Sequence, residues 1–314
     1  MWKDILGQES AINILKKTIK QNRLGSSYLF SGPDGVGKTK TAKELAKVCN
    51  CQNVQQEDSC GVCSSCYKIE QDIHPDVKVI KPASIHFLIS QIQNLQKEVY
   101  TTPFEGKKKV YILDEIDKMT KEAANAFLKT LEEPTSNTMF ILITSGLETL
   151  LPTITSRCRP VRFNLIPEGI QTQIFSKWGL EPSKFHLLAQ ASGGSLGRAK
   201  EYLEKGIFEH QDKLSASLEN IFNEASLKSD EGFLLISKIA TQIVDYYKKE
   251  NIELFLEIFS VWLKQSVKLV SLNFINLYKA IDIVIETQKI IRFQNANLQL
   301  AMEVMFIKLK ECRN

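Results

Sequence analysis

Hydrophobic and polar positions along the first 165 residues follow two alternating patterns, one typical of helices and one typical of buried strands. Residues 9–23 place Ile12, Leu15 and Ile19 on one face of a helix. Short apolar runs predict strands at 27–31, 110–113 and 139–144, and further strand candidates lie at 75–80 and 161–163. Helical spacing predicts helices between them at 38–48, 85–99 and 121–133. This alternation predicts an α/β fold, in which helices cover both faces of a parallel sheet.

The pattern changes after this region. Residues 166–207 indicate short helices, interrupted by the pair Gly193-Gly194. Beyond them the chain has no proline and a single glycine, Gly232, and its apolar spacing stays helical. A chain of 314 residues also exceeds what one hydrophobic core usually supports. We therefore expect three domains: an α/β domain over 1–165, a small helical domain over 166–207 and an all-α domain over 208–314.

Composition excludes several classes of protein. The chain is 43% hydrophobic and 24% charged, which is typical of a globular protein and excludes global disorder or a coiled coil. We find no apolar run of about 18 residues and no apolar segment of a secretory signal, so we expect a cytoplasmic protein without a membrane partner. The net charge of +4 is too small to predict nucleic-acid binding by itself.

A phosphate-binding loop is the first candidate for chemistry. Residues 32–39 read G-P-D-G-V-G-K-T and fit the motif G-x-x-x-x-G-K-[ST] between a predicted strand and a predicted helix. Three glycines let backbone N–H groups turn toward a polyphosphate; they are Gly32, Gly35 and Gly37. Lys38 would neutralise the β- and γ-phosphates and the Thr39 hydroxyl would bind Mg²⁺. The motif predicts ATP and Mg²⁺ as cofactors.

Acidic residues at the end of the 110–113 strand are the partners that such a loop requires. Asp114 can hold the Mg²⁺ shell, and Glu115 can polarise an attacking water molecule. Acids at a strand end are common, but these follow a central strand downstream of a phosphate loop. Together the loop and the acids predict nucleotide binding and make hydrolysis chemically feasible.

Four cysteines in a short polar segment, within residues 49–70, suggest an inserted metal module. The ligands would be Cys51, Cys60, Cys63 and Cys66. Four thiolates suit tetrahedral Zn²⁺, and with no open coordination position the ion would be structural. The alternatives are disulfides, which a cytoplasmic chain should not hold, a redox Cys-x-x-Cys pair, and an iron–sulfur cluster. Cys49 lies on the preceding helix and is not expected to bind the metal; His74 and His86 lack ligand spacing and are expected at the surface or in turns.

Together these residues resemble bacterial clamp-loader subunits of the AAA+ class, the delta-prime and gamma/tau subunits of DNA polymerase III. The phosphate loop, the acidic strand end and the cysteine spacing match that family's motifs, and residues 4–8 resemble its adenine-contacting segment. The family's further motifs are matched at 124–134, 156–158 (Ser-Arg-Cys), 194–199 and 295–298. The resemblance implies a AAA+ nucleotide-binding domain, a helical lid and a helical collar.

The resemblance also implies roles for three more residues. Arg157 would be an arginine finger that acts in trans on the γ-phosphate bound by a neighbouring subunit. Thr144 would be the sensor 1 residue, and Arg198 would sense the γ-phosphate in cis. Asp34 departs from the family by placing a negative charge inside the phosphate loop, which would weaken nucleotide binding.

The implied function is part of an ATP-dependent clamp loader within a DNA polymerase holoenzyme. Partners would be the other loader subunits (gamma/tau and delta) in a hetero-oligomeric ring, the sliding clamp, and primed DNA through the assembled complex. The chain ends at Asn314 without the further domains of tau, which favours a delta-prime stator that donates Arg157. The intact Lys38 and Glu115 favour the alternative, a short gamma-type ATPase motor. A remote alternative is an unrelated P-loop kinase acting on a small molecule.

Overall fold

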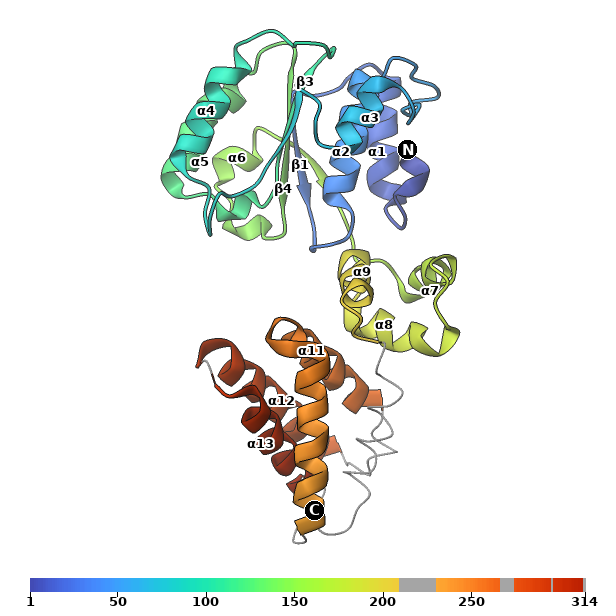
Figure 1. Ribbon diagram of the computed structural model, residues 1–314. Coiled ribbons are helices and arrows are strands. Elements are labelled where there is room, and N and C mark those ends of the chain that lie inside the picture. The colour runs from blue at the N-terminus through green and yellow to red at the C-terminus, as the bar shows by residue number, and fades with distance from the viewer. Residues whose placement is uncertain (209–229, 266–273, 295, 313–314) are drawn as a thin grey trace. The chain divides into compact units, whose positions relative to one another are not determined.

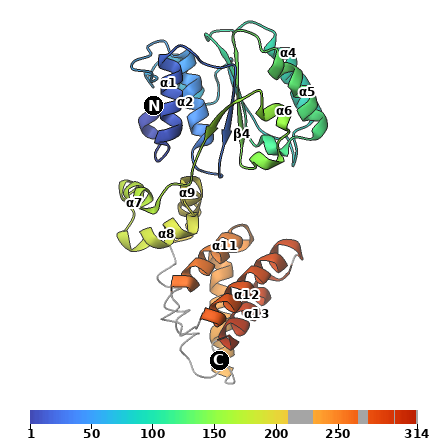
Figure 2. The same ribbon diagram turned by 180° about the vertical axis from the view of Figure 1, so that it is seen from behind.

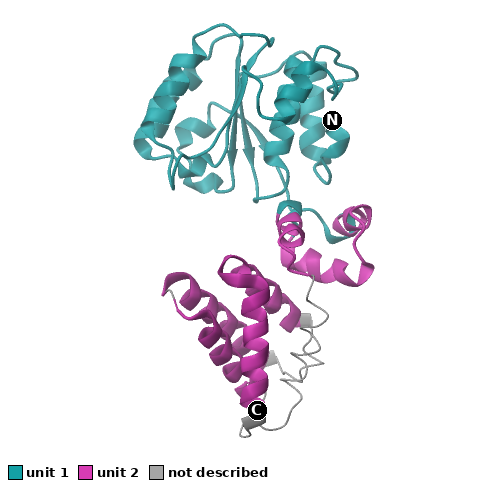
Figure 3. Cartoon of the chain, in the orientation of Figure 1, with its two compact units in different colours: residues 1–170, 194–197 teal, residues 171–193, 198–314 magenta. Residues whose placement is uncertain are grey.

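The computed structural model describes residues 1–208, 230–265, 274–294 and 296–312. The chain forms two compact units (Figure 3). The first contains residues 1–170 and 194–197, and the second contains residues 171–193 and 198–314. Asn295, part of the segment that resembles a collar motif, lies outside the described residues.

The first unit is built on a sheet of five parallel strands in the order β2-β3-β4-β1-β5. The strands are β1 (Ser27–Ser31), β2 (Val77–Ile80), β3 (Lys109–Leu113), β4 (Thr138–Thr144) and β5 (Arg159–Arg162). Every residue of β1, β3 and β4 is buried, as their continuously apolar sequences predict. In the register, Ser31 pairs with Thr144 and Leu113 pairs with Leu142, so these strands end close together.

Helices cover both faces of this sheet, which confirms the predicted architecture (Figures 1 and 2). On one face lie α1 (Glu9–Lys20), α2 (Lys38–Asn50) and α3 (Ser64–Glu70). On the other lie α4 (Ile89–Val99), α5 (Lys121–Glu132) and α6 (Pro152–Thr155). Short 3-10 turns are η1 (Trp2–Asp4), η2 (Ile116–Lys118) and η3 (Leu147–Thr149). Each face has its own apolar core, with Leu45 and Ile112 in one and Phe127 and Phe140 in the other.

Two elements begin later than predicted, each for a local reason. The α4 helix starts at Ile89, not at residue 85, because the Gln91 side chain holds the preceding segment as a loop. Its amide bonds the backbone of Ala83, Leu88 and Lys81. The β2 strand starts at Val77 because the Val77 N–H closes a turn onto the carbonyl of His74.

The regular elements of the second unit are all helices within its described residues. Its elements are α7 (Glu168–Lys177, which begins in the first unit), η4 (Pro182–Lys184), α8 (Phe185–Ser192), α9 (Leu196–Glu204, whose first two residues belong to the first unit), α11 (Asp230–Gln265), α12 (Phe274–Phe293) and α13 (Leu298–Glu311). The α11 helix is interrupted at Lys248, whose φ of 50° and ψ of −178° are not helical. Among the described helices, none combines the length and apolar character needed to cross a membrane.

Candidate nucleotide and metal sites

The carboxyl ends of the parallel strands bring the predicted nucleotide-binding residues together at one edge of the sheet. The phosphate loop follows β1, Asp114 follows β3, and Thr144 is the last residue of the neighbouring β4. Ligands of open parallel sheets bind at this edge, where loops from several strands converge. This arrangement brings residues that are far apart in the sequence together beside the phosphate loop.

Glycine is required in the phosphate loop by conformation and by space. Gly35 and Gly37 have φ values of 71° and 102°, a region that residues with a side chain rarely adopt. A Cβ on Gly32 would lie 2.2 Å from the carbonyl oxygen of Phe163. The α2 helix begins directly after Gly37, so its N-terminus faces the space that the loop encloses.

Lys38 is the cation of the loop and is 6% exposed. Its Nζ donates hydrogen bonds to the carbonyls of Gly32 (2.5 Å) and Pro33 (2.6 Å). Burial lowers the pKa of Lys38 below its ordinary value, and the nearby carboxylates of Asp34 and Asp114 oppose that shift. The Asp34 side chain is exposed to solvent, and its Oδ1 is 3.4 Å from Lys38 Nζ. Its negative charge therefore offsets the positive charge of Lys38 only in part.

A hydroxyl and a carboxylate meet beside this lysine. Thr39 Oγ1 donates a hydrogen bond to Asp114 Oδ2 at 3.0 Å, across 75 residues of sequence. Hard oxygen ligands of this kind suit Mg²⁺, which is usually held by one or two protein groups together with substrate phosphates. The residues present therefore fit the predicted Mg²⁺ site.

The remaining predicted catalytic residues have different partners. Glu115 adopts a left-handed conformation, with φ of 58°, and its carboxylate forms an ion pair with Lys118. Thr144 Oγ1 donates to Asp117 at 2.8 Å. Asp117 was not identified from the sequence, although a third acid after Asp114 and Glu115 was the available signal.

The predicted arginine finger, Arg157, and the predicted sensor, Arg198, each form an ion pair with a carboxylate. Arg157, one residue beyond the C-cap of α6, donates from Nη2 to Glu132 Oε1 (2.5 Å) and from Nη1 to the Thr153 carbonyl (2.9 Å). Its side chain remains 35% exposed. In the second unit, Arg198 on α9 donates to Glu257 Oε2 at 2.7 Å. Because its side chain is partly exposed, Arg157 lies at the surface of the first unit and is accessible to another molecule.

The four predicted thiols come together in three dimensions. Cys51 is the C-cap of α2, Cys63 is the N-cap of α3, and Cys66 lies within α3. All four sulfur atoms, including that of Cys60, lie within 4.8 Å of one another, and two of the pairs are 4.0 Å apart. Sulfurs around a tetrahedral ion bound at about 2.3 Å are roughly 3.8 Å apart, so the group fits a single zinc ion. A cluster of several irons, each bound by its own thiolate, would need more widely spaced sulfurs.

Burial and backbone N–H groups act on these thiols in opposite directions: burial raises the pKa of Cys51 and of Cys66, whereas backbone N–H groups favour the thiolate form that a metal requires. The N–H groups of Asn53 and Cys60 each lie 3.3 Å from Cys51 Sγ. Backbone N–H groups of Val62 and Cys63 lower the pKa of Cys60. Cys49 lies outside the group, and burial raises the pKa of its thiol to about 11, which is typical of an inert cysteine.

His74 was expected at the surface or in a turn: it opens the turn that precedes β2, but its side chain is not at the surface. Its side chain is buried, its Nε2 is 3.1 Å from Ser65 Oγ, and its Nδ1 accepts the N–H of Asp76. Burial lowers the pKa of His74. The ring therefore fixes the segment that follows the cysteine module, whereas His86 is exposed as expected.

The chain is similar in sequence to a known family and to several known proteins. The family described as "DNA polymerase III, delta subunit" matches residues 7–167. DNA polymerase III subunit delta' of Bacillus subtilis is 37% identical over 210 residues, which cover 65% of this chain and 63% of the relative. DNA polymerase III subunit tau of Escherichia coli is 36% identical over 210 residues, covering 65% of this chain and 32% of that protein. The chain thus spans less than two thirds of the length of these relatives.

A solved structure shows the same fold at low identity. The crystal structure of a DNA polymerase III gamma subunit-related protein from Thermotoga maritima superposes with a TM-score of 0.54 at 19% identity. The likeness covers 97% of this chain and 100% of that one.

Proposed function

Because the chain belongs to the DNA polymerase III delta subunit family of clamp-loader proteins, we propose that it acts in an ATP-dependent clamp loader that places a sliding clamp on primed DNA. The observation that supports this proposal is the group of phosphate-loop and Mg²⁺-binding candidates that the first unit brings together. Lys38 lies within the phosphate loop, and the Thr39 hydroxyl meets Asp114 at 3.0 Å. Relatives of the chain are named as the delta', tau and gamma subunits of DNA polymerase III, which supports the same assignment.

In this proposal the chain's own residues bind and orient ATP. The N–H groups of the loop and Lys38 hold the β- and γ-phosphates, and Thr39 and Asp114 hold the Mg²⁺, which neutralises phosphate charge when bound. In the gamma-type alternative, where the chain turns over ATP itself, Glu115 would orient the attacking water molecule after exchanging its contact with Lys118. Thr144, oriented by Asp117, and Arg198 respond to the γ-phosphate.

We further propose that the subunit is a delta-prime stator, which donates Arg157 to ATP bound by its neighbour. A guanidinium at that position stabilises the charge that develops on the transferred phosphoryl group. The exposed position of Arg157 on the first unit supports donation to another subunit. The gamma-type motor is the second candidate, and the Thr39–Asp114 contact favours it, because a subunit that only donates an arginine does not need this pair.

The remaining proposals concern structure and partners. The four thiols hold one structural zinc ion. Residues 166–207 act as a lid, and residues 208–314 act as a collar that binds the gamma/tau and delta subunits in a ring. Exposed apolar side chains support a role for the collar in binding partners; they include Phe233, Leu234, Tyr278, Phe293 and Leu300. Contact with primed DNA occurs through the assembled ring.

ATP turnover in the reconstituted loader tests the stator proposal. The chain is mixed with its cognate loader subunits, clamp and primed DNA, as wild type or as Lys38→Ala, Arg157→Ala or the control Arg23→Ala. Arg23 is exposed and lies beyond the end of α1. A stator loses the turnover of the neighbouring site in Arg157→Ala, because an arginine finger accelerates that step by about a thousandfold or more. Lys38→Ala should remain near wild type.

The reverse pattern identifies the motor. If Lys38→Ala abolishes the turnover and Arg157→Ala leaves it unchanged, the stator proposal is wrong. Arg23→Ala should match the wild type in either case, and it controls for the loss of a surface charge.

A further inference from the structure

The cysteine site has one weakly constrained ligand. Cys60, Cys63 and Cys66 are separated by two residues each, and α3 orders the last of them. Cys51 is instead separated from Cys60 by eight residues, 52–59, which contain no helix and only the isolated bridge between Gln55 and Asp58. Ordering the backbone of these residues costs conformational entropy, so the position of this loop has to be stabilised by other contacts.

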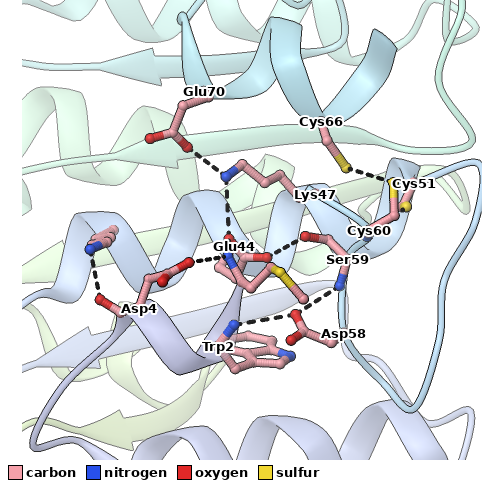
Figure 4. A network of polar contacts seen from close by, with 12 residues as sticks. Trp2, Asp4, Glu44, Lys47, Cys51, Asp58, Ser59, Cys60, Cys66 and Glu70 are labelled. Atoms are coloured by element: carbon pink, nitrogen blue, oxygen red, sulfur yellow. Dashed lines mark hydrogen bonds and ion pairs between the residues drawn. The ribbon is translucent and has the colours of Figure 1, made fainter. Parts of the chain in front are cut away.

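Residues 57–59, directly before Cys60, are fixed by contacts from outside the module, of which Figure 4 shows those of Asp58 and Ser59. The Trp2 indole Nε1 donates to the carbonyl of Glu57 at 2.7 Å. Asp58 Oδ1 accepts the backbone N–H of Trp2 at 3.2 Å and that of Ser59 at 2.8 Å. The Ser59 hydroxyl donates to Glu44 Oε1 at 2.5 Å. Three consecutive residues are thus held by η1 and by α2.

Glu44 is the central group of these contacts. Its side chain is 4% exposed, and Ser59 is also buried. Besides Ser59, its carboxylate contacts the Met1 amino group at 2.9 Å and Lys47 Nζ at 3.3 Å. Lys47 in turn reaches Glu70 on α3 at 2.5 Å. A buried carboxylate needs such partners, and several of them together fix it in one position.

The same helix therefore contacts the module at two places. Glu44 holds the loop before Cys60 from the side of α2, whereas Cys51 ends α2 and is itself a ligand. Because α2 is a continuous helix between these residues, it sets the distance between the Cys51 sulfur and the loop that carries Cys60.

We propose that Glu44, acting through Ser59, is a positioning residue for the metal site: it holds residues 57–59 so that Cys60 completes the four-sulfur group. The inference rests on the proposed zinc site. Contacts that orient metal ligands without touching the metal typically change metal affinity by about ten- to one hundredfold when they are removed. Trp2 contributes to the same anchor through its hydrogen bond to Glu57.

Zinc affinity of the full chain tests this assignment, measured by competition with a chelating dye. The variants are Glu44→Gln, Ser59→Ala and Trp2→Phe, and the matched control is Ser192→Ala. Ser192 is equally buried, and its hydroxyl bonds Gln171 Oε1 at 3.0 Å in the second unit. We expect the Kd for zinc to rise about ten- to one hundredfold in Glu44→Gln and Ser59→Ala, less in Trp2→Phe, and not in Ser192→Ala.

Thermal melting with and without zinc separates positioning from a general loss of stability. A positioning role predicts that the increase in Tm produced by zinc becomes smaller in Glu44→Gln and Ser59→Ala. Equal losses of Tm in the zinc-free and zinc-loaded forms, or a zinc Kd within twofold of the wild type, would overturn the inference. A wild-type chain that binds no zinc would instead overturn the metal proposal, and this inference with it.

Discussion

Replacing Gly197 by alanine should weaken nucleotide binding, although Gly197 lies outside the phosphate loop. The Gly197 N–H donates to the carbonyl of Gly35 at 2.8 Å, so the segment that resembles sensor 2 supports the loop directly. A Cβ built on Gly197 would lie 2.7 Å from Gly35 Cα and 3.1 Å from its carbonyl oxygen. Both of these neighbours are backbone atoms, which cannot move away as a flexible side chain would.

The size of the effect follows from that distance. Ordinary contact begins at 3.4 Å, so Gly35 and the new methyl group have to separate by 3.4 − 2.7 = 0.7 Å. A displacement of this size misaligns loop N–H groups that would bond the phosphates, and a hydrogen bond to a charged group contributes about 1.5–3 kcal/mol. Losing or weakening one such bond raises the Kd for ATP about ten- to one hundredfold.

Titration of the full chain with a fluorescent ATP analogue in excess Mg²⁺ measures this change. The matched control is Gly169→Ala, because a Cβ on Gly169 has no atom within 4 Å. The control should bind as the wild type does. If Gly197→Ala is folded and its Kd stays within twofold of the wild type, the sensor 2 segment does not support the loop, and the reasoning is refuted.

Three further predictions concern Mg²⁺ binding, the segment 104–106 that Asp76 holds, and the proposed zinc ion. Thr39→Val should remove the increase in ATP affinity that Mg²⁺ produces and leave Mg²⁺-free binding unchanged, as calorimetry would show; an unchanged Mg²⁺ effect would exclude this ligand. Asp76→Asn should lower the free energy of unfolding in urea at pH 7 by about 2–4 kcal/mol, because the carboxylate accepts the N–H groups of residues 104–106 at 2.7–2.8 Å. Burial alone would raise the pKa of Asp76, but these hydrogen bonds hold it below its ordinary value. The stabilisation is therefore complete above an unfolded pKa of about 3.9 and is lost as the pH falls through the lower folded value, so the difference from Asp76→Asn should shrink only in acid. Metal analysis should find one zinc per chain, and removing it with a chelator should lower Tm; less than one zinc after gentle purification would count against the site.

The sheet was predictable because its strands carry their signal locally. The β1, β3 and β4 strands are continuous apolar runs, and each was placed within one residue of its observed bounds. The phosphate loop and the cysteine group were predictable for the same reason, since their chemistry lies in fixed short spacings. By contrast, α3 is a short polar helix inside the cysteine module, with little apolar periodicity to reveal it.

Residues that act on others across the fold could not be found in this way. The contacts of Thr144 with Asp117 and of Glu44 with Ser59 join residues 27 and 15 positions apart. Each contact depends on how separate elements pack. Serine and glutamate side chains are also usually exposed to solvent, so the sequence alone gives no reason to expect Ser59 and Glu44 to be buried. The same holds for His74, whose burial follows from contacts with Ser65 and Asp76.

Clamp loading itself tests the central claim most directly. The cognate loader is assembled with wild-type chain, with Arg157→Ala or without this chain, and sliding clamp retained on primed circular DNA is counted after ATP is added. We predict efficient loading only with the wild-type chain, because Arg157 completes the neighbouring ATP site. Equal loading in the absence of this chain would contradict its assignment as a clamp-loader subunit, and equal loading with Arg157→Ala would contradict the role of the arginine.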